Sequence, residues 1–224
     1  MIDFKGSRFE EEIILTNVYW YLRYPLSYRD LEEIAKDRGL VLDRSSIQRW
    51  VVKFTPQLED VVRKKKRPVG GNWRMDETYV KVKGKWKYLY RAVDKEGNTI
   101  DYLLTAKRDR KAAKRFFKKS IVGNSIPEKI NIDKSGSNKA AIEDYNEDNK
   151  TDIEIRQCKY LNNIIEQDHR FIKKIMRPML GFKSFWSASI TLAGIEIVRM
   201  IKKGQLKNQD NCAMSSAQQF LALA

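Results

Sequence analysis

The spacing of apolar residues changes at one point in this 224-residue chain, close to residue 72. Before that point apolar side chains recur every three or four residues, which is typical of amphipathic helices. After it, NWRMDETYVKVKG and KWKYLYRAVDKEG alternate bulky apolar and polar residues, which is the pattern of half-buried strands. The sequence therefore predicts a helical segment followed by a segment built on a sheet.

Three helices are predicted in the N-terminal segment. The first covers residues 9–24. The second is expected to begin at Ser27, with Asp30 completing a variant of the capping box, and to end at Gly39. Asp43 is placed to cap the start of the third.

A helix, a glycine-containing turn and a second helix with polar residues near its start form the sequence pattern of a helix-turn-helix. In that motif the start of the second helix contacts the edges of DNA bases. The alternative is a small three-helix bundle with an ordinary polar surface, and this stretch alone does not separate the two. The outward-facing residues that are candidates for DNA contact are Arg44, Ser45, Gln48, Arg49 and Lys53.

A basic segment with turn-forming residues follows, and it predicts a linker over 64–71 that could also track DNA phosphates. Its basic residues are Lys64, Lys65, Lys66 and Arg67. We therefore expect a helix-turn-helix domain over 1–63, a sheet domain over 72–206 and a weakly patterned C-terminal tail over 207–224.

The predicted order after residue 72 is three strands, then helix, strand, helix, strand and helix. Gly84 with Lys85, and Gly97 with Asn98, mark the two connections between the first three strands. A final amphipathic helix is expected over 184–203. This order predicts an α/β fold in which helices flank a mixed five-stranded sheet.

The net charge of +15 predicts a polyanionic partner, because a positive field attracts nucleic acid or an acidic membrane. Residues 1–71 hold 14 lysines and arginines against 11 acids, and residues 72–206 hold 29 against 17, so the later segment is expected to carry most of that contact. No basic leader opens the chain and no apolar run approaches about 20 residues. We expect no membrane contact and a cytoplasmic, nucleoid-associated protein.

Cysteine and histidine usage limits the kinds of metal site. Cys158 and Cys212 lie far apart and outside any Cys-x-x-Cys spacing, and His169 is the single histidine. This argues against a zinc site and a disulfide scaffold, and it suits a reducing compartment.

The segment 159–174, KYLNNIIEQDHRFIKK, has two unlike faces when read as a helix. Its apolar arc, extended past the segment, consists of Leu161, Ile164, Ile165, Phe171, Ile172, Ile175 and Met176. A lone acid, Glu166, shares the other face with basic residues, and His169 lies at the edge of that face. The basic candidates for DNA contact are Arg170, Lys173, Lys174 and Arg177. The face is either a solvated surface with ordinary ion pairs, or a metal-binding carboxylate beside bases that hold a phosphodiester.

Two other acids lie in strands that are otherwise apolar. Asp76 is in the middle of the first predicted strand and Asp133 ends the fourth. Burial of an acid is costly unless the acid is paired or binds a metal. The first and fourth strands can be neighbours when a helix crosses between them, and Glu166 on a helix over that edge could complete a cluster.

Clustered carboxylates are stable mainly around a cation, and oxygen-only ligands favour Mg²⁺ or Mn²⁺. Two such ions about 4 Å apart can activate a water or a 3′-hydroxyl in a phosphoryl displacement. Other acids compete for this role. Glu77 and Asp94 are expected to be surface or turn residues, and Asp168, inside the apolar arc, is expected to pair with a buried donor.

These segments also carry a resemblance. WRMDETYVKVKGKWKYLYRAVD, NIDK, KYLNNIIEQDHRFIKK and RPMLGFKSF together resemble the DDE transposases of bacterial insertion sequences, and the nearest match is the insertion-sequence six family. SYRDLEEIAKDRGL and SSIQRWV resemble the N-terminal DNA-binding segment of that family, and the likeness runs from about Phe4 to Gln205. It implies a ribonuclease-H-like core with Asp76, Asp133 and Glu166 as metal ligands and catalytic residues. It also implies a catalytic role for Lys173, the basic residue seven positions after the glutamate.

The resemblance implies a transposase that binds the terminal inverted repeats of an insertion sequence and uses Mg²⁺, as two ions, for nicking and strand transfer. The implied transposition is replicative. The implied partners are double-stranded DNA, at transposon ends and target, and further copies of the chain, as a homodimer or larger assembly on DNA. The alternatives are a helix-turn-helix regulator, a structure-specific nuclease of the same fold, and a catalytically impaired copy, because the Asp133–Glu166 interval is slightly short for the family.

Overall fold

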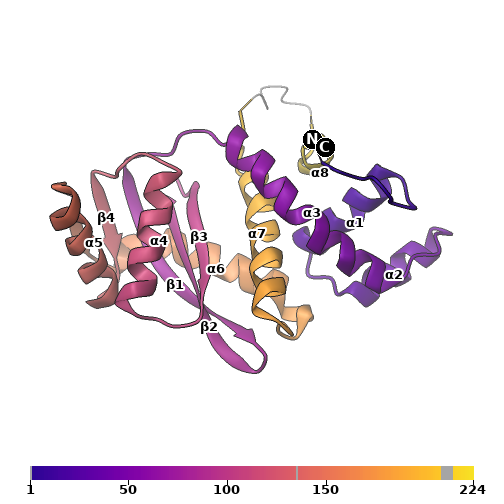
Figure 1. The fold of residues 1–224 in the computed structure, drawn as a ribbon, viewed down its shortest axis with the longest axis horizontal. Helices are drawn as coiled ribbons and strands as arrows, with labels where there is room; N and C mark the ends of the chain where they lie inside the picture. Colours follow the sequence, from indigo (N-terminus) through magenta and orange to yellow (C-terminus); the bar gives the residue numbers. More distant parts are fainter. Residues whose placement is uncertain (1, 135, 208–213) are drawn as a thin grey trace. The chain divides into compact units, whose positions relative to one another are not determined.

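The computed structural model describes residues 2–134, 136–207 and 214–224. The chain folds into two compact units (Figure 1). The first unit joins Met1–Arg67 to Ile172–Ala224, and the second is Pro68–Phe171. No helix in the described ranges is long and apolar enough to cross a membrane.

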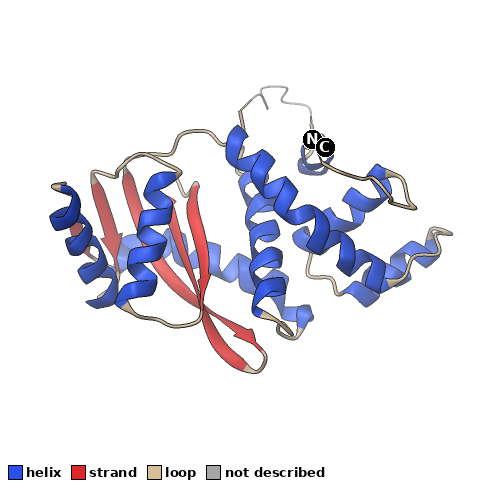
Figure 2. Cartoon of the chain, viewed as in Figure 1, coloured by secondary structure: helices blue, strands red, loops and turns tan. Residues whose placement is uncertain are grey.

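The second unit is built on a five-stranded sheet in the order β3-β2-β1-β4-β5 (Figure 2). Its strands are β1 (Asn72–Val82), β2 (Lys85–Asp94), β3 (Thr99–Thr105), β4 (Lys129–Ile132) and β5 (Glu154–Gln157). β1, β2 and β3 are antiparallel, whereas β1, β4 and β5 run parallel. This is the mixed five-stranded sheet predicted from the sequence, and β1 lies beside β4.

Helices of the second unit pack on this sheet. They are α4 (Arg110–Val122), α5 (Gly136–Asn149), the 3₁₀ helix η1 (Lys159–Asn162) and α6 (Asn163–Met176), which continues into the first unit. The apolar core lies between the sheet and α4 and α5, with Trp73 and Ile130 from the strands and Phe116, Phe117 and Ile142 from the helices. Odd-numbered residues of β1 therefore point to this core, and even-numbered residues point to the opposite face of the sheet.

Tight turns connect β1 to β2 and β2 to β3. Lys83 and Gly84 both have positive φ, which is the two-residue hairpin turn whose twist matches that of its strands. Asp94 accepts hydrogen bonds from the backbone N–H groups of Asn98 at 2.7 Å and Gly70 at 3.2 Å. Asp94 is therefore a turn residue, as predicted, although it is buried.

The first unit is helical. Its elements are α1 (Glu11–Arg23), α2 (Tyr28–Asp37), α3 (Arg44–Lys65), the 3₁₀ helix η2 (Arg177–Met179), α7 (Phe185–Lys202) and α8 (Ser216–Leu221). Ser27 and Asp30 form the predicted capping box at the start of α2, and Asp43 accepts a hydrogen bond from the N–H of Ser45 at the start of α3. The three N-terminal helices begin close to their predicted positions because their signals are local.

The units differ in extent from the predicted domains. Helix α3 continues to Lys65, because Leu58 and Val62 keep its apolar face buried to the end, so the predicted linker over 64–71 is partly helical. Helix α7, expected within the domain over 72–206, lies instead with α1 and α3 in the first unit. It is buried on nearly all sides, and a helix of that kind must be surrounded by other helices.

Two local predictions also differ from the structure. The expected helix over 159–174 starts as the 3₁₀ helix η1, which rotates successive residues by a wider angle than an α-helix. Leu161 in η1 and Ile164 at the start of α6, both placed on the apolar arc, are exposed. The tail contains α8, which is capped by Ser215 and buries Phe220. Cys158 carries a free thiol, and Cys212 lies outside the described residues.

Candidate active site

The parallel pairing of β1 with β4 brings the two strand aspartates close together. Arg74 pairs with Asn131, and the same offset continued for two residues sets Asp133 opposite Asp76. Neighbouring strands lie about 4.8 Å apart, and residues two apart along a strand project from the same face. The two carboxyl groups therefore leave the sheet on the same side, away from the apolar core.

The electrostatic surroundings of Asp76 link all three predicted acids. The pKa of Asp76 is raised to about 7, first by burial and then by the negative charges of Glu77, Asp133 and Glu166, while a hydrogen bond from the Glu77 backbone lowers it. Charges that act on one carboxyl group in this way lie near it. The acids on β1, after β4 and on α6 therefore share one region of the second unit.

Asp133 is held by an arginine that the sequence analysis did not single out. Its Oδ2 lies 3.6 Å from Nη2 of Arg108, and its side chain is 39% exposed. Arg108 also forms an ion pair with the buried Glu77, which accepts a 2.9 Å hydrogen bond from Nδ2 of Asn138. The prediction that Glu77 is a surface or turn residue was wrong, because Glu77 lies on the part of β1 that α5 covers.

The three acids do not form a closed metal-coordinating group. Within residues 2–134, 136–207 and 214–224, no three side chains of His, Cys, Asp or Glu are grouped closely enough to hold a metal ion as they stand. Asp133 remains open to solvent, so its pairing with Arg108 does not seal it from a cation.

Helix α6 contacts the strand aspartate through the single histidine. Nδ1 of His169 lies 3.5 Å from Oδ2 of Asp76. His169 was expected at the edge of the polar face, but it is buried. The contact orients the Asp76 carboxyl group from the side of the helix that carries Glu166.

A buried ion pair joins the same helix to β2. Nη2 of Arg91 lies 3.2 Å from Oδ2 of Asp168, and the two side chains are 0% and 5% exposed. The expectation that Asp168 pairs with a buried donor is confirmed. Arg91 is the partner of Asp76 in the β1–β2 register, and Asp168 follows Glu166 by two residues, so this pair fixes α6 against the sheet beside the acids.

Three residues around the acids were not assigned a role from the sequence, namely Arg91, Arg108 and His169. The position of Asp168 in an apolar arc signalled that a buried base must exist, but not which one. Arg108 lies in the connection before α4, and nothing in its local sequence indicates its two acidic partners.

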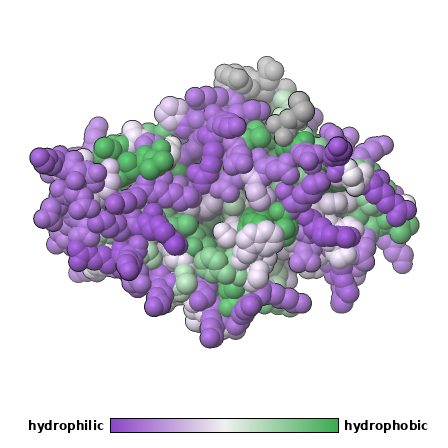
Figure 3. Space-filling model, in the orientation of Figure 1, coloured by the Kyte–Doolittle hydropathy of each residue, from purple (hydrophilic) through white to green (hydrophobic). Residues whose placement is uncertain are grey.

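The predicted DNA-contact residues are mostly at the surface. Arg44, Ser45, Gln48, Arg49 and Lys53 are exposed on α3, and Lys64, Lys65 and Arg67 follow them, while Lys66 is half-buried. Arg170, Lys173, Lys174 and Arg177 are exposed as well. Hydrophilic side chains cover most of the surface seen in Figure 3, as expected for a chain with net charge +15. Lys173 lies on α6 beyond Phe171, where the second unit ends.

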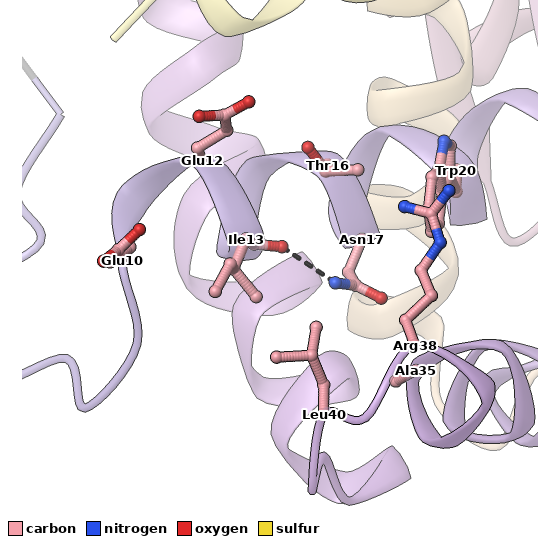
Figure 4. Close-up of a pocket in the computed structure, with 9 residues that line it drawn as sticks. All are labelled: Glu10, Glu12, Ile13, Thr16, Asn17, Trp20, Ala35, Arg38 and Leu40. Carbon is pink, nitrogen blue, oxygen red and sulfur yellow. Dashed lines mark hydrogen bonds between the residues drawn. The ribbon is translucent and has the colours of Figure 1, made fainter.

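The first unit contains a cavity of about 180 Å³ between α1 and α2 (Figure 4). Arg38 lies over the ring of Trp20 at 5.0 Å, and Nδ2 of Asn17 donates to the carbonyl oxygen of Ile13 at 2.8 Å. The first of these contacts keeps the two helices together, and the acids described above belong to the other unit.

Removal of one partner of the buried pair should destabilise the protein. Arg91→Met leaves the Asp168 carboxylate buried without its base, which costs about 3–5 kcal/mol in known cases. The matched control, Arg156→Met, breaks an exposed pair with Glu154 and should cost at most about 1 kcal/mol. Denaturant unfolding measures both. Equal losses in the two variants would contradict the role given to Arg91.

The raised pKa of Asp76 predicts how stability depends on pH without metal ions. The pKa of Asp76 is higher in the folded chain than in the unfolded chain. Its contribution to stability is therefore complete at a pH below the unfolded-state pKa, and it is lost as the pH rises through about 7. Asp76→Asn cannot ionise, so its thermal stability relative to the unsubstituted chain should increase between pH 5 and pH 8 in EDTA. Asp60→Asn, at an exposed position of α3, is the control. A relative stability of Asp76→Asn that stays constant over this range would refute the prediction.

Comparisons with known proteins agree with this arrangement. A family described as the DDE domain matches residues 70–205. A transposase for the insertion sequence-like element IS431mec of Staphylococcus aureus is 40% identical over 201 residues, which cover 89% of this chain and 88% of that protein. The transposase for the insertion sequence element IS257 in transposon Tn4003, also from Staphylococcus aureus, has the same identity and coverage.

Among solved structures, the dimeric form of the HTLV-2 integrase catalytic core domain in complex with magnesium is 17% identical. The match has a TM-score of 0.42 and covers 50% of this chain and 74% of that chain. The family match over more than half of the chain, together with the relatives matched over nearly all of it, shows that the chain belongs to the DDE transposases of bacterial insertion sequences, in the insertion-sequence six family.

Proposed function

We propose that this chain binds the terminal inverted repeats of its insertion sequence and catalyses Mg²⁺-dependent nicking and strand transfer of DNA. In this proposal Asp76, Asp133 and Glu166 are the catalytic metal ligands. The proposal is supported by the parallel β1–β4 register, which ends at Arg74 and Asn131, two residues before Asp76 and Asp133. The same offset continued along both segments would set these two acids opposite each other on the face of the sheet away from the apolar core. Glu166 on α6 is the third acid, and its negative charge contributes to the raised pKa of Asp76.

The chemistry of these donors fits a hard divalent cation. All three side chains offer carboxylate oxygens, which suit Mg²⁺ or Mn²⁺. A buried acid with pKa near 7 is stabilised in its ionised form by a nearby positive charge. Two divalent ions bound there would lower the pKa of an attacking water or 3′-hydroxyl and stabilise the leaving oxygen.

Neighbouring side chains would prepare the acids for this role. His169 and the Arg91–Asp168 pair hold Asp76 and α6 in place. Arg108 neutralises part of the charge on Asp133, and its 3.6 Å separation leaves that carboxylate free to turn towards an ion. Lys173 would contact the phosphate backbone close to the scissile bond.

Recognition of the transposon ends is assigned to the first unit. The exposed residues at the start of α3 would read base edges as the second helix of a helix-turn-helix, and Lys64–Arg67 would follow the phosphates. Arg170, Lys174 and Arg177 would add phosphate contacts along α6 and beyond it. Two DNA ends must be held together during transposition, so we expect at least a homodimer on DNA, with target DNA as the second substrate and a replicative product.

Loss of Asp76 should abolish the chemistry and spare DNA binding. With Mg²⁺, the unsubstituted protein should nick an oligonucleotide that carries the terminal inverted repeat, and Asp76→Asn should reduce nicking by more than the roughly 10–100-fold that loss of an outer partner costs. Asp60→Asn should retain activity. Nicking at an unchanged rate by Asp76→Asn would remove Asp76 from the site.

The same assay separates the alternatives. A regulator or an impaired copy would bind the repeat without any Mg²⁺-dependent nicking. A structure-specific nuclease would nick without producing the joined strand-transfer product on a gel.

Substitutions at the start of α3 should weaken end recognition and leave the chemistry intact. Arg44→Ala or Arg49→Ala should each cost about 1–3 kcal/mol of binding to the repeat if the side chain contacts a base, with a smaller effect on scrambled DNA. Arg115→Ala, at an exposed position of α4, is the control. Fluorescence anisotropy measures binding, and a change in metal dependence in either α3 variant would contradict this division of roles.

A further inference from the structure

β1 and β2 continue past the rest of the sheet as a two-stranded ribbon (Figure 2). β3 pairs with β2 only as far as Tyr88, and β4 pairs with β1 only over Asn72–Arg74. In the described part of the chain, strand pairing of Val80–Lys87 is therefore confined to the ribbon itself. The ribbon ends in the tight turn at Lys83 and Gly84.

One face of this ribbon is aromatic. Tyr79 is paired with Tyr88, and Lys81 with Trp86, so these four side chains share a face, which we call the aromatic face. The Tyr79 ring centroid lies 6.2 Å from that of Trp86 and 5.4 Å from that of Tyr88, and Nζ of Lys81 lies 5.9 Å from the Trp86 centroid. The three rings thus form one continuous platform with a lysine beside it.

This platform is exposed to solvent. Tyr79 is 47% exposed and Trp86 is 59% exposed, whereas Val80 and Val82 on the opposite face of the ribbon are buried. Exposed neighbouring rings of this kind mark a surface that binds a partner. The burial of the valines holds the ribbon in place and leaves the rings on the open side.

The charge of the ribbon indicates the partner. Between Thr78 and Val93 the sequence contains no acid. The ribbon and its turn carry Lys81, Lys83, Lys85 and Lys87. None of these four lysines forms a salt bridge with a residue that the structure describes. A polyanion therefore complements this surface, and aromatic rings between lysines are the combination that binds unpaired nucleic acid, through base stacking and phosphate contacts.

The position of the ribbon relates it to the acids. The ribbon continues β1 beyond Asp76, which Tyr79 follows by three residues. Because residues an odd number apart in a strand project from opposite faces, the aromatic face lies on the other side of the sheet from the Asp76 carboxyl group.

We propose that the aromatic face binds an unpaired strand of the DNA that reacts at Asp76. The proposal rests on the catalytic role given to Asp76 above. It assigns the ribbon the task of holding the strand that leaves the duplex, through stacking on Trp86 and Tyr79 and through phosphate contacts by the lysines.

Photocrosslinking in EDTA tests this binding without any reaction. The probe is a duplex that carries the element end and a ten-nucleotide unpaired flank, with 5-iodouracil at one flank position in each of a series of probes. The full chain should crosslink at a limited set of flank positions, and Trp86→Ala should lose that crosslink. Trp86→Ala should also bind the flanked probe about tenfold more weakly, with little change on a blunt duplex.

Two matched controls accompany these variants. Trp186→Ala removes a similarly exposed tryptophan, 63% exposed on α7, and should leave both readouts unchanged. The double variant Lys81→Gln, Lys83→Gln should bind the flanked probe with a weaker dependence on salt. The slope of log binding constant against log salt concentration should fall in magnitude by about 0.7 for each phosphate that the lysines no longer neutralise. Lys111→Gln with Lys118→Gln, on exposed positions of α4, should not.

Unchanged affinity and an unchanged crosslink pattern in Trp86→Ala would overturn the proposal. A change in sedimentation of that variant without DNA, with no change in the crosslinks, would instead make the aromatic face a contact between copies of the chain and would also overturn it. If crosslinks map to the ribbon but the unsubstituted protein never nicks with Mg²⁺, the proposed catalytic function fails while strand binding stands.

Discussion

The repulsion among carboxylates that the sheet brings together is the constraint on which the rest of the second unit depends. The parallel pairing of β1 with β4 requires a crossover, which α4 provides, and it ends two residues before Asp76 and Asp133. Burial and neighbouring negative charges then make ionisation of Asp76 unfavourable, and its pKa rises to about 7. The fold therefore brings a carboxyl group that is costly to ionise close to other acids.

Basic side chains from distant segments keep that arrangement folded. Arg91 from β2 is fully buried against Asp168, and Arg108 neutralises both Glu77 and Asp133. A buried ion pair is costly to break, because the charge that remains is neither solvated by water nor neutralised by a partner. Arg91 also joins α6 to the sheet on the side where Glu166 acts on Asp76, so a contact that supports the fold also supports the arrangement of these acids.

The first unit is held together mainly by apolar packing between its helices. Gly194 in α7 allows a close approach to α1, since a Cβ atom there would lie 2.6 Å from Leu22. The apolar surface of α7 packs against the N-terminal helices, although α7 follows the sheet segment in the chain. The helical unit is thus built from both ends of the chain.

The sequence by itself determined the features that depend on near neighbours along the chain. The change of apolar period near residue 72, the cap at Ser27, the hairpin turns and the acids in apolar strands were all readable, because their causes lie within a few residues. They were enough to predict the order of helices and strands along the chain and to single out three candidate acids. Only the tertiary structure decided that Arg91 meets Asp168, 77 residues away, that Glu77 is buried with Arg108, and that α7 joins the N-terminal helices. Such pairings depend on which surfaces the completed fold brings into contact, and that is a property of the whole chain.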